Sequence, residues 1–376
     1  MSSVYPQIDP DGLLEYSVVY TDRAVNHMSQ SFQQVMIDIS ATLKEVYGAS
    51  AVAVVPGSGT FGMEAVARQF AINKKCLVIR NGWFSYRWTQ IFETGNIPAK
   101  EIICQARQTG KESTAPFAPV PIDEVVAAIR DEKPDLVFAP HVETSSGMLL
   151  PDEYVKAVGH AVREVGGLFV LDCIASGAIW VDMLQADVDV LISAPQKGWS
   201  GSPCAALVMM SERARKMIDD TTSNSFACDL AKWLWIMETY EQGGHAYHAT
   251  MPTDGLVTFS HMMNEMKQIG FDTVYHRQQE LGDRVRSLLD MKGFKSVAAD
   301  GYGAPGVVVC YTDDPAIQNG SKFAELGLQI AAGVPLQCGE PDGFSTFRLG
   351  LFGLDKLNNI DAAVATLEKA LDQVLA

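Results

Sequence analysis

Nearly continuous apolar runs alternate with amphipathic segments through the first half of the chain. The runs are short, as expected for strands buried on both faces of a parallel sheet, and they cover residues 51–55, 75–79, 134–140, 168–172, 188–194 and 205–210. Apolar residues recur at helical spacing in segments 29–47, 122–133 and 154–165. This alternation predicts an α/β fold with a mostly parallel, doubly wound sheet.

The pattern changes in two other regions. Residues 96–121 are rich in Pro, Gln, Thr and Gly, and they predict an irregular excursion at the edge of the sheet. After about residue 255 we expect a long helix to 289, short strands near 306–311, a helix near 321–331 and a final helix from 361. The chain is therefore expected to have an N-terminal arm (1–18), a large α/β domain (19–255) and a smaller C-terminal α+β domain (256–376).

Composition narrows the possible partners and location. A net charge of −16 argues against nucleic acid or anionic membrane as a partner, because both attract basic surfaces. The seven cysteines are scattered without a C-x-x-C pair, which is typical of reduced thiols in a cytoplasmic protein. His245 and His248 have no carboxylate or thiolate beside them, so we expect no metal site. The first residues show no secretory pattern, and no apolar run reaches the ~18 residues that cross a membrane.

Two of the apolar runs lead to ionisable residues. The run 168–172 ends on Asp172, and Lys197 lies just past the run 188–194. Ligands of open α/β sheets bind outside the carboxyl ends of the strands, so both side chains are expected in one crevice. Pyridoxal phosphate needs an amine that holds it as a Schiff base and a carboxylate beside its pyridine nitrogen. The alternative is that Asp172 caps a turn and Lys197 is a solvated surface residue.

A glycine-rich turn at residues 57–62 follows the first strand and opens a helix. Backbone N–H groups and the helix dipole would bind a phosphate there, with the hydroxyls of Ser58 and Thr60 beside Gly59. The same residues spell G-x-G-x-x-G, a pattern found in dinucleotide-binding proteins. Such proteins carry an acid at the end of the next strand, where this chain has Arg80, which would suit a 2′-phosphate. An NADP-dependent oxidoreductase is therefore an alternative.

Three further segments carry candidate chemistry. In the aromatic cluster at 83–88, either Phe84 or Trp83 could stack on a flat cofactor ring, although such clusters are also common in hydrophobic cores. The loop 141–147 has three adjacent hydroxyls, including that of Ser145, which suit the phenolic oxygen of the cofactor. Arg348 lies among apolar neighbours, so it either pairs with an acid or binds a substrate carboxylate.

Taken together, these motifs resemble fold-type I pyridoxal-phosphate enzymes of aminotransferase class V, and within that class the alanine/serine:glyoxylate aminotransferases. The similar segments lie in order at residues 57–60, 81–87, 143–147, 171–176, 193–197, 247–252 and 347–350. The resemblance implies a fold-type I pyridoxal-phosphate transferase with pyridoxal 5′-phosphate as its cofactor.

The resemblance also implies a role for each matching residue. Lys197 is then the Schiff-base lysine, Asp172 binds the ring nitrogen, and Arg348 holds the substrate carboxylate. The remaining cofactor contacts would be Ser58, Gly59, Thr60, Phe84, Ser145, Gln196, Tyr247 and Thr250. In the family the loop that matches 247–252 reaches the phosphate of the neighbouring subunit, which implies a homodimer with shared active sites.

The expected activity is transamination from a small amino acid, alanine- or serine-like, to a small keto acid, glyoxylate- or pyruvate-like. A cysteine desulfurase or a β-lyase on the same fold is the alternative, and Cys338 is its candidate sulfur acceptor. Desulfurases typically carry His before the lysine, whereas this chain has Gln196.

Overall fold

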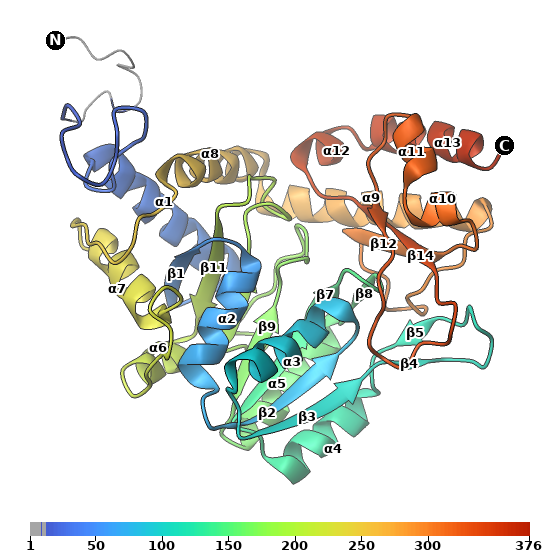
Figure 1. Ribbon diagram of the computed structural model, residues 1–376, viewed down its shortest axis with the longest axis horizontal. Coiled ribbons are helices and arrows are strands. Elements are labelled where there is room, and N and C mark those ends of the chain that lie inside the picture. Colours follow the sequence, from blue (N-terminus) through green and yellow to red (C-terminus); the bar gives the residue numbers. More distant parts are fainter. Residues whose placement is uncertain (1–8, 10–12) are drawn as a thin grey trace.

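A seven-stranded sheet forms the centre of the computed structural model, which describes Asp9 and residues 13–376 (Figure 1). Of these strands, β11 runs antiparallel to both of its neighbours, and the pairs from β10 to β3 are parallel. The order is β1 (Ala51–Pro56), β11 (Ala205–Met210), β10 (Val190–Ser193), β9 (Leu168–Asp172), β6 (Leu136–Pro140), β2 (Lys75–Arg80) and β3 (Lys100–Gln105). The predicted mostly parallel α/β architecture is confirmed.

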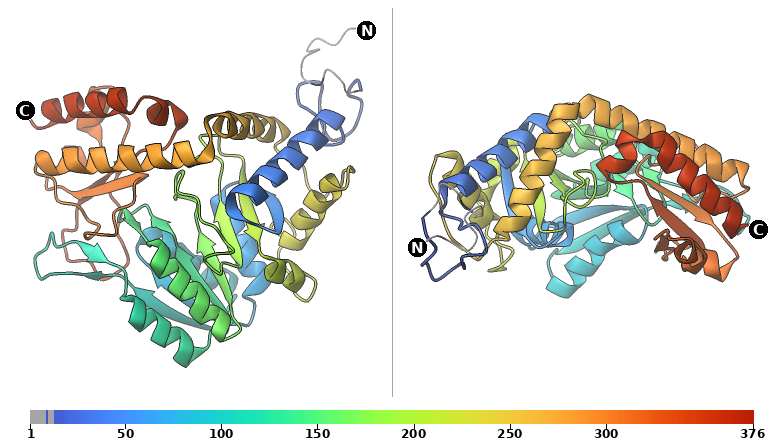
Figure 2. Two further views of the ribbon diagram at one scale, coloured as in Figure 1. Left: turned by 180° about the vertical axis from the view of Figure 1, so that it is seen from behind. Right: turned by 90° about the horizontal axis from the view of Figure 1, so that it is seen from above.

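Helices cover both faces of this sheet, because strands buried on two sides need an apolar layer on each. Figure 1 shows α2 (Gly59–Phe70) and α3 (Trp83–Gly95) in front of the sheet, and Figure 2 shows α4 (Ile122–Glu132) and α5 (Asp152–Glu164) from behind. At the β1 edge lie α1 (Gln30–Tyr47), α6 (Glu212–Ile218) and α7 (Leu230–Glu241).

The first helix shows why the periodicity was informative. Its buried residues include Phe32, Met36, Ile39 and Leu43, which recur at helical spacing and therefore share one face. Gly48 ends the helix in the left-handed conformation, with φ of 66°. The predicted helix at 29–47 is confirmed.

The expectation of an irregular excursion at 96–121 was wrong for its first part. Residues Lys100–Gln105 form β3, which is hydrogen-bonded in parallel to β2 at the edge of the sheet. Each of its residues is at least partly exposed, so the strand lacks the continuous apolar pattern of the buried ones. Beyond it, β4 (Arg107–Gln108) and β5 (Phe117–Ala118) pair with each other.

The C-terminal part contains a second sheet with the order β12 (Val307–Tyr311), β14 (Thr346–Gly350) and β13 (Ala331–Ala332). Its pairs are antiparallel. Around it lie α9 (Phe271–Met291), α10 (Pro315–Gln318), α11 (Ser321–Glu325), α12 (Leu354–Asn358) and α13 (Ile360–Val374).

Two helices in this part are shorter than expected. The predicted helix to residue 289 is two helices, α8 (Thr253–Ile269) and α9, because Gly270 between them has φ of 96°. The helix expected at 321–331 ends at Glu325. Since α8 packs against α1 of the larger part, the domain boundary at residue 255 stays a prediction.

Most of the predicted N-terminal arm, residues 1–8 and 10–12, lies outside the described residues. The described residues 13–18 contain no helix or strand. Within the described residues, no helix has both the length and the apolar character needed to cross a membrane.

Candidate active site

A pocket of about 200 Å³ lies where the carboxyl ends of β9 and β10 meet the N-terminus of α2. Asp172 and Lys197 both line it, as the sheet topology predicted. The other predicted site residues in its wall are Ser58, Gly59, Thr60, Phe84 and Gln196. The remaining lining residues are Met63, Arg87, Val142, Thr144, Ile174 and Ala175.

Asp172 is a buried carboxylate at the last position of β9. Its Oδ1 accepts a hydrogen bond from the backbone N–H of Ile174 (2.9 Å), which fixes the orientation of the carboxyl group. Burial raises the pKa of Asp172 from 3.8 to about 7, and the charge of Glu143 adds to this while that of Arg87 opposes it. A cationic ring nitrogen beside it would supply the compensating charge that this carboxylate lacks.

Lys197 lies in the turn after β10, with Nζ 5.1 Å from the centre of the Phe352 ring. Burial lowers the pKa of this amine, and the nearby charge of Arg348 lowers it further. The turn depends on Gly198, where an added Cβ would lie 1.9 Å from the carbonyl oxygen of Gly177. A lysine with a lowered pKa is suited to attack an aldehyde, because a larger fraction of it is neutral.

The start of α2 offers a phosphate site. Ser58 is the N-cap residue and its side chain makes no capping bond. Within the described chain, the backbone N–H groups of Gly59 and Thr60 have no acceptor, as expected in the first turn of a helix. The amide oxygen of Gln196 is also buried without a partner. The unpaired N–H groups fit a phosphorylated ligand, whereas the Gln196 oxygen is an acceptor and fits a ligand group that donates a hydrogen bond.

Glu143 holds the loop after β6 against the N-terminus of α3, a role that is not evident from the sequence. Its buried carboxylate accepts hydrogen bonds from the backbone N–H of Phe84 (3.2 Å) and from both the N–H (2.8 Å) and the hydroxyl (2.7 Å) of Ser85. It also accepts from the N–H (3.0 Å) and hydroxyl (2.7 Å) of Ser145. Five donors on one carboxylate make this contact the frame of the pocket wall.

The hydroxyl of Ser145 both donates and accepts a hydrogen bond in the network around Glu143. It donates to Glu143 and accepts from the backbone N–H of Trp83 (2.9 Å), and Ser145 does not line the pocket. The neighbouring Thr144 does line it. An added Cβ at Gly82 would lie 2.1 Å from Ser145 Oγ, so a glycine is needed at this close approach.

Phe84 forms one wall of the pocket and is flanked by two arginines. The guanidinium carbon of Arg87 lies 5.0 Å from the centre of its ring, and that of Arg348 lies 5.6 Å away. Trp83, the other candidate for stacking on the cofactor ring, packs instead against Tyr86 with ring centres 5.7 Å apart and does not line the pocket.

Arg348 has no carboxylate within ion-pair distance in the described part of the chain, so the structural pairing considered above is absent. Its Nε donates to the carbonyl oxygen of Ala332 (2.8 Å), and burial lowers its pKa despite the opposing charge of Glu143. A half-buried guanidinium without an acid fits an anionic substrate group.

Tyr247 and Thr250 lie outside this pocket. Both are exposed, and their hydroxyl oxygens are 3.1 Å apart. The structure of one chain therefore does not bring them to the other predicted site residues.

Two residues behind the alternative functions are unsuited to those roles. Arg80 is buried, donates to Thr89 Oγ1 (2.7 Å) and lies 4.8 Å from the Tyr86 ring centre, so it is not free for a 2′-phosphate. Cys338 is buried, and its thiol donates to the Arg80 carbonyl oxygen (3.5 Å). Burial raises the pKa of this thiol to about 12, which keeps it from acting as a thiolate.

The residues in the pocket fit pyridoxal phosphate. A lysine with a lowered pKa, a buried carboxylate, a helix N-terminus with unpaired N–H groups and an aromatic wall converge on one cavity. Glu143 and Thr144 were not singled out as site residues, although an acid and a hydroxyl directly after an apolar strand were a usable signal.

Comparisons with known proteins agree with this geometry. A "2-aminoethylphosphonate--pyruvate transaminase" of Paraburkholderia phymatum is 28% identical over 93% of this chain and 89% of its own length. A "Soluble hydrogenase, small subunit" of Synechococcus sp. is 25% identical over 93% and 88%. The crystal structure of an alanine–glyoxylate aminotransferase from Nostoc sp. superposes with a TM-score of 0.79 at 22% identity. The superposition covers 94% of this chain and 89% of that one, so the two share the fold-type I architecture. Residues 12–311 match the family described as "Aminotransferase class-V", so the chain belongs to that family and is a pyridoxal-phosphate-dependent aminotransferase.

Proposed function

We propose that the enzyme transfers an amino group from a small amino acid, alanine- or serine-like, to a small keto acid, glyoxylate- or pyruvate-like, with the cofactor bound covalently to Lys197. The observation that carries this proposal is the shared pocket of Lys197, Asp172 and the α2 N-terminus. Arg348 near the same pocket supports a substrate with one carboxylate. The resemblance to alanine/serine:glyoxylate aminotransferases supports the small donor and acceptor.

Each side chain then has a defined task. Pyridoxal phosphate supplies an aldehyde and an electron-accepting ring. Asp172 would keep the ring nitrogen protonated, Phe84 would lie against the ring, and Arg348 would bind the substrate carboxylate in a bidentate contact. The Lys197 amine would hold the cofactor aldehyde and would also be the base that moves the Cα proton of the substrate. Its lowered pKa favours this step because a base must be neutral to accept a proton.

The remaining cofactor contacts belong to two groups. Ser58, Gly59 and Thr60 with Gln196 bind the phosphate. For the phenolic oxygen we propose Thr144 as the direct hydroxyl contact, and Ser145 as the residue that fixes the loop through Glu143.

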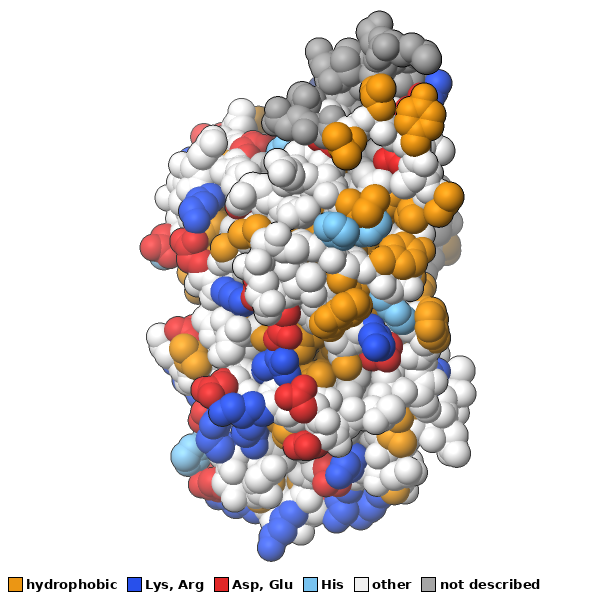
Figure 3. Space-filling view, turned by 90° about the vertical axis from the view of Figure 1, so that its left-hand side faces the viewer, with side chains coloured by type: hydrophobic (Ala, Val, Ile, Leu, Met, Phe, Trp, Pro, Cys, Tyr) orange, Lys and Arg blue, Asp and Glu red, His pale blue; other side chains and the backbone are white. Residues whose placement is uncertain are grey.

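We propose that the enzyme is a homodimer in which Tyr247 and Thr250 complete the phosphate site of the other subunit. Hydrophobic side chains and histidines gather on the face that carries α7 and the segment that precedes α1 (Figure 3). Among the exposed large hydrophobic residues are Tyr16, Val18 and Trp235, together with Tyr247 itself. Exposed apolar surface of this kind favours association.

The unpaired cysteines of the described chain support a cytoplasmic location.

The activity is tested with purified protein by absorbance and by donor screening. The wild-type protein is expected to show the visible absorbance of bound cofactor and to convert alanine or serine with glyoxylate or pyruvate. Lys197→Ala should lose covalent cofactor and activity, whereas Lys111→Ala at an exposed position should keep both. Retention of borohydride-stable cofactor by Lys197→Ala would refute the assigned lysine.

Shared active sites are tested by mixing two inactive variants. Lys197→Ala lacks the amine, and Tyr247→Ala lacks the residue proposed to serve the partner. A mixed dimer contains one site with Lys197 from one subunit and Tyr247 from the other, so activity should return on mixing. No recovery in a confirmed mixed dimer would contradict the shared arrangement.

A further inference from the structure

The ring of Phe352 reaches the Lys197 amine from the C-terminal part of the chain. Lys197 Nζ lies 5.1 Å from the centre of this ring, which is within the distance at which an aromatic face attracts an ammonium group. Phe352 is not among the residues that line the cofactor pocket, and the proposed function gives it no task. Because the proposed function depends on Lys197, a ring this close to its amine bears on the chemistry.

The position of the ring is fixed by the loop that connects β14 with α12. The backbone N–H of Leu351 donates to the carbonyl oxygen of Gly306 (2.9 Å). An added Cβ at Gly306 would lie 3.1 Å from Cε1 of Phe352, so the absence of a side chain at Gly306 leaves the space that the ring occupies. The carbonyl oxygen of Phe352 accepts a hydrogen bond from the ammonium group of Lys356 in α12 (2.8 Å).

The turn that carries Lys197 is tied to the same loop. The backbone N–H of Ser200 donates to the carbonyl oxygen of Lys197 (3.1 Å). The hydroxyl of Ser200 accepts from the backbone N–H of Leu354 at the start of α12 (3.0 Å), 154 positions further along the chain. Ser200 has the left-handed conformation, with φ of 57°, which is uncommon for residues other than glycine. These contacts hold the amine and the ring of Phe352 together across the two parts of the chain.

The charges around the amine oppose its protonated form. Burial lowers the pKa of Lys197, and the charge of Arg348 on β14 lowers it further. Arg87 on α3 lines the same pocket. Asp172 on β9 is the one acid among the described residues of the pocket wall, and the proposed function pairs it with the cofactor nitrogen. A base that accepts the Cα proton becomes a cation, so it needs a further partner in these surroundings.

An aromatic ring suits a base that must both accept and release a proton. The negative face of the ring attracts an ammonium group although the ring has no formal charge. A carboxylate in the same place would hold the proton on the amine, whereas a base must be neutral to accept the Cα proton. The weaker attraction of a ring therefore favours the cation and still lets the proton leave.

We propose that Phe352 is a positioning residue that holds the Lys197 amine when this amine is not bonded to the cofactor, and that its ring stabilises the ammonium form. The inference rests on the proposed function of Lys197 and deepens it. Phe352 acts through Lys197, so its loss changes the acid–base behaviour of that amine.

The cofactor-free enzyme tests the proposal without turnover. Competitive acetylation between pH 6 and pH 11, followed by mass spectrometry of the peptide that contains Lys197, gives the pH midpoint of the amine and the plateau rate of its neutral form. Phe352→Leu replaces the ring with an apolar side chain and should move the midpoint to lower pH. Acetylation below the midpoint should then be about three- to tenfold faster, at an unchanged plateau rate. Phe352→Tyr keeps an aromatic face and should keep the wild-type midpoint.

Fluorinated phenylalanines at position 352 separate the attraction of the ring from its shape. Each added fluorine weakens the negative face of the ring while the shape stays nearly constant. The midpoint should therefore fall stepwise from phenylalanine to the monofluoro, difluoro and trifluoro rings. An equal midpoint for all four rings would contradict the proposed stabilisation of the ammonium group.

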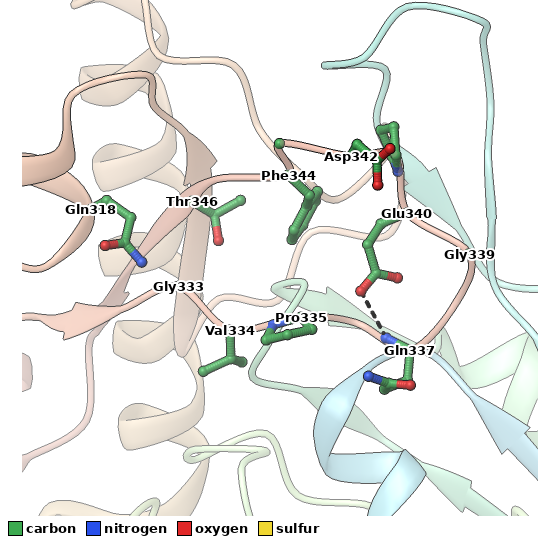
Figure 4. Close-up of a pocket in the computed structure, with 12 residues that line it drawn as sticks. Gln318, Gly333, Val334, Pro335, Gln337, Gly339, Glu340, Asp342, Phe344 and Thr346 are labelled. Atoms are coloured by element: carbon green, nitrogen blue, oxygen red, sulfur yellow. Dashed lines mark hydrogen bonds between the residues drawn. The ribbon is translucent and has the colours of Figure 1, made fainter.

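Phe344→Leu is the matched control. Phe344 is also half-buried in the C-terminal part, and it packs against the same apolar cluster as Phe352. Figure 4 shows Phe344 beside a hollow of about 580 Å³ that shares no described lining residue with the cofactor pocket. Its ring lies against Phe117 and Tyr311, with ring centres 6.1 Å and 5.5 Å apart. The loss of this ring should leave the midpoint of Lys197 unchanged.

The loaded enzyme provides a second readout. The acid limb of the pH profile of kcat, with the donor that the screen identifies, should move to lower pH in Phe352→Leu, because kcat reports the groups of the enzyme–substrate complex. An acetylation midpoint equal to that of the wild type, or one that moves as far in Phe344→Leu, would overturn the proposal. A higher plateau rate at an unmoved midpoint would show a purely structural role and would also overturn it. If Lys197→Ala loses covalent cofactor and activity, the aminotransferase function stands in each of these cases, and if that variant stays active, both fall.

Discussion

Replacing Asp172 with asparagine in the cofactor-free protein should stabilise it at neutral and alkaline pH. The carboxyl group is buried, and its pKa rises from 3.8 to about 7 on folding because burial disfavours the charge. Between these two values the folded chain keeps a proton that the unfolded chain releases. The free energy of unfolding therefore falls as pH rises through this window, and it is fully reduced above pH 7.

The magnitude follows from the size of this rise. About 3 pH units, at roughly 1.4 kcal/mol each, correspond to about 4 kcal/mol. Asparagine is neutral throughout, and its side-chain oxygen can still accept from the backbone N–H of Ile174. We expect the variant and the wild type to be similar near pH 4 and to differ by up to about 4 kcal/mol near pH 8.

The assay is urea unfolding of both cofactor-free proteins between pH 4 and pH 8. Asp300→Asn, at an exposed position, is the control and should follow the wild-type curve at each pH. The difference between the two free energies of unfolding at each pH cancels the titration of groups that both proteins share. One such group is buried His141, whose pKa falls to about 4. The claim that burial raises the pKa of Asp172 would be refuted by a difference in the free energy of unfolding that stays constant over this range. It would also be refuted if the wild type were the more stable protein at pH 8. With cofactor bound the order should reverse, because the carboxylate then meets a cationic nitrogen.

Three further changes test the frame of the pocket. Glu143→Ala removes the acceptor of five hydrogen bonds and should lower the free energy of unfolding by roughly 3 kcal/mol or more, measured by urea unfolding. Gly82→Ala places a methyl group 2.1 Å from Ser145 Oγ and should lower the free energy of unfolding by about 1–3 kcal/mol. The control is Gly350→Ala, whose methyl group would have no atom nearer than 3.6 Å and should lower the free energy of unfolding less in the same assay. Arg87→Met keeps the stem but removes the charge beside Asp172, so we expect the cofactor dissociation constant to rise at least tenfold by fluorescence titration, and an unchanged constant would contradict this role.

The buried strands were predictable from sequence because burial on both faces leaves a continuous apolar run. Strand β9 is such a case, since each of its five residues is buried and its last residue is the acid that we propose to bind the cofactor. Strand β3 was missed because an edge strand has one open side and its residues alternate irregularly between half-buried and exposed. The break at Gly270 was missed because an isolated glycine can be tolerated inside a helix, and its positive φ becomes visible only in the folded chain.

Residues that carry the proposed chemistry were easier to predict than those that position them. Lys197 and Asp172 follow directly from strand ends, since topology alone brings these ends to one edge of the sheet. The choice between Phe84 and Trp83 could not be made from sequence, because adjacent positions at the start of a helix differ in direction by about 100°. The structure places Phe84 in the pocket wall and Trp83 against Tyr86.

The contrast between Thr144 and Ser145 shows why the supporting contacts are hidden from sequence. Both are hydroxyl residues of one loop, and pattern alone favours neither. Glu143 decides between them, since its carboxylate accepts the hydrogen bond that the Ser145 hydroxyl donates, and Thr144 lines the pocket. That decision depends on Gly82, 63 positions before Ser145 in the chain, whose missing side chain lets the two segments approach. A Ser145→Ala variant should therefore weaken the fold more than it changes the cofactor contacts. If it instead shifts the absorbance of bound cofactor without changing the urea midpoint, the hydroxyl contacts the cofactor directly.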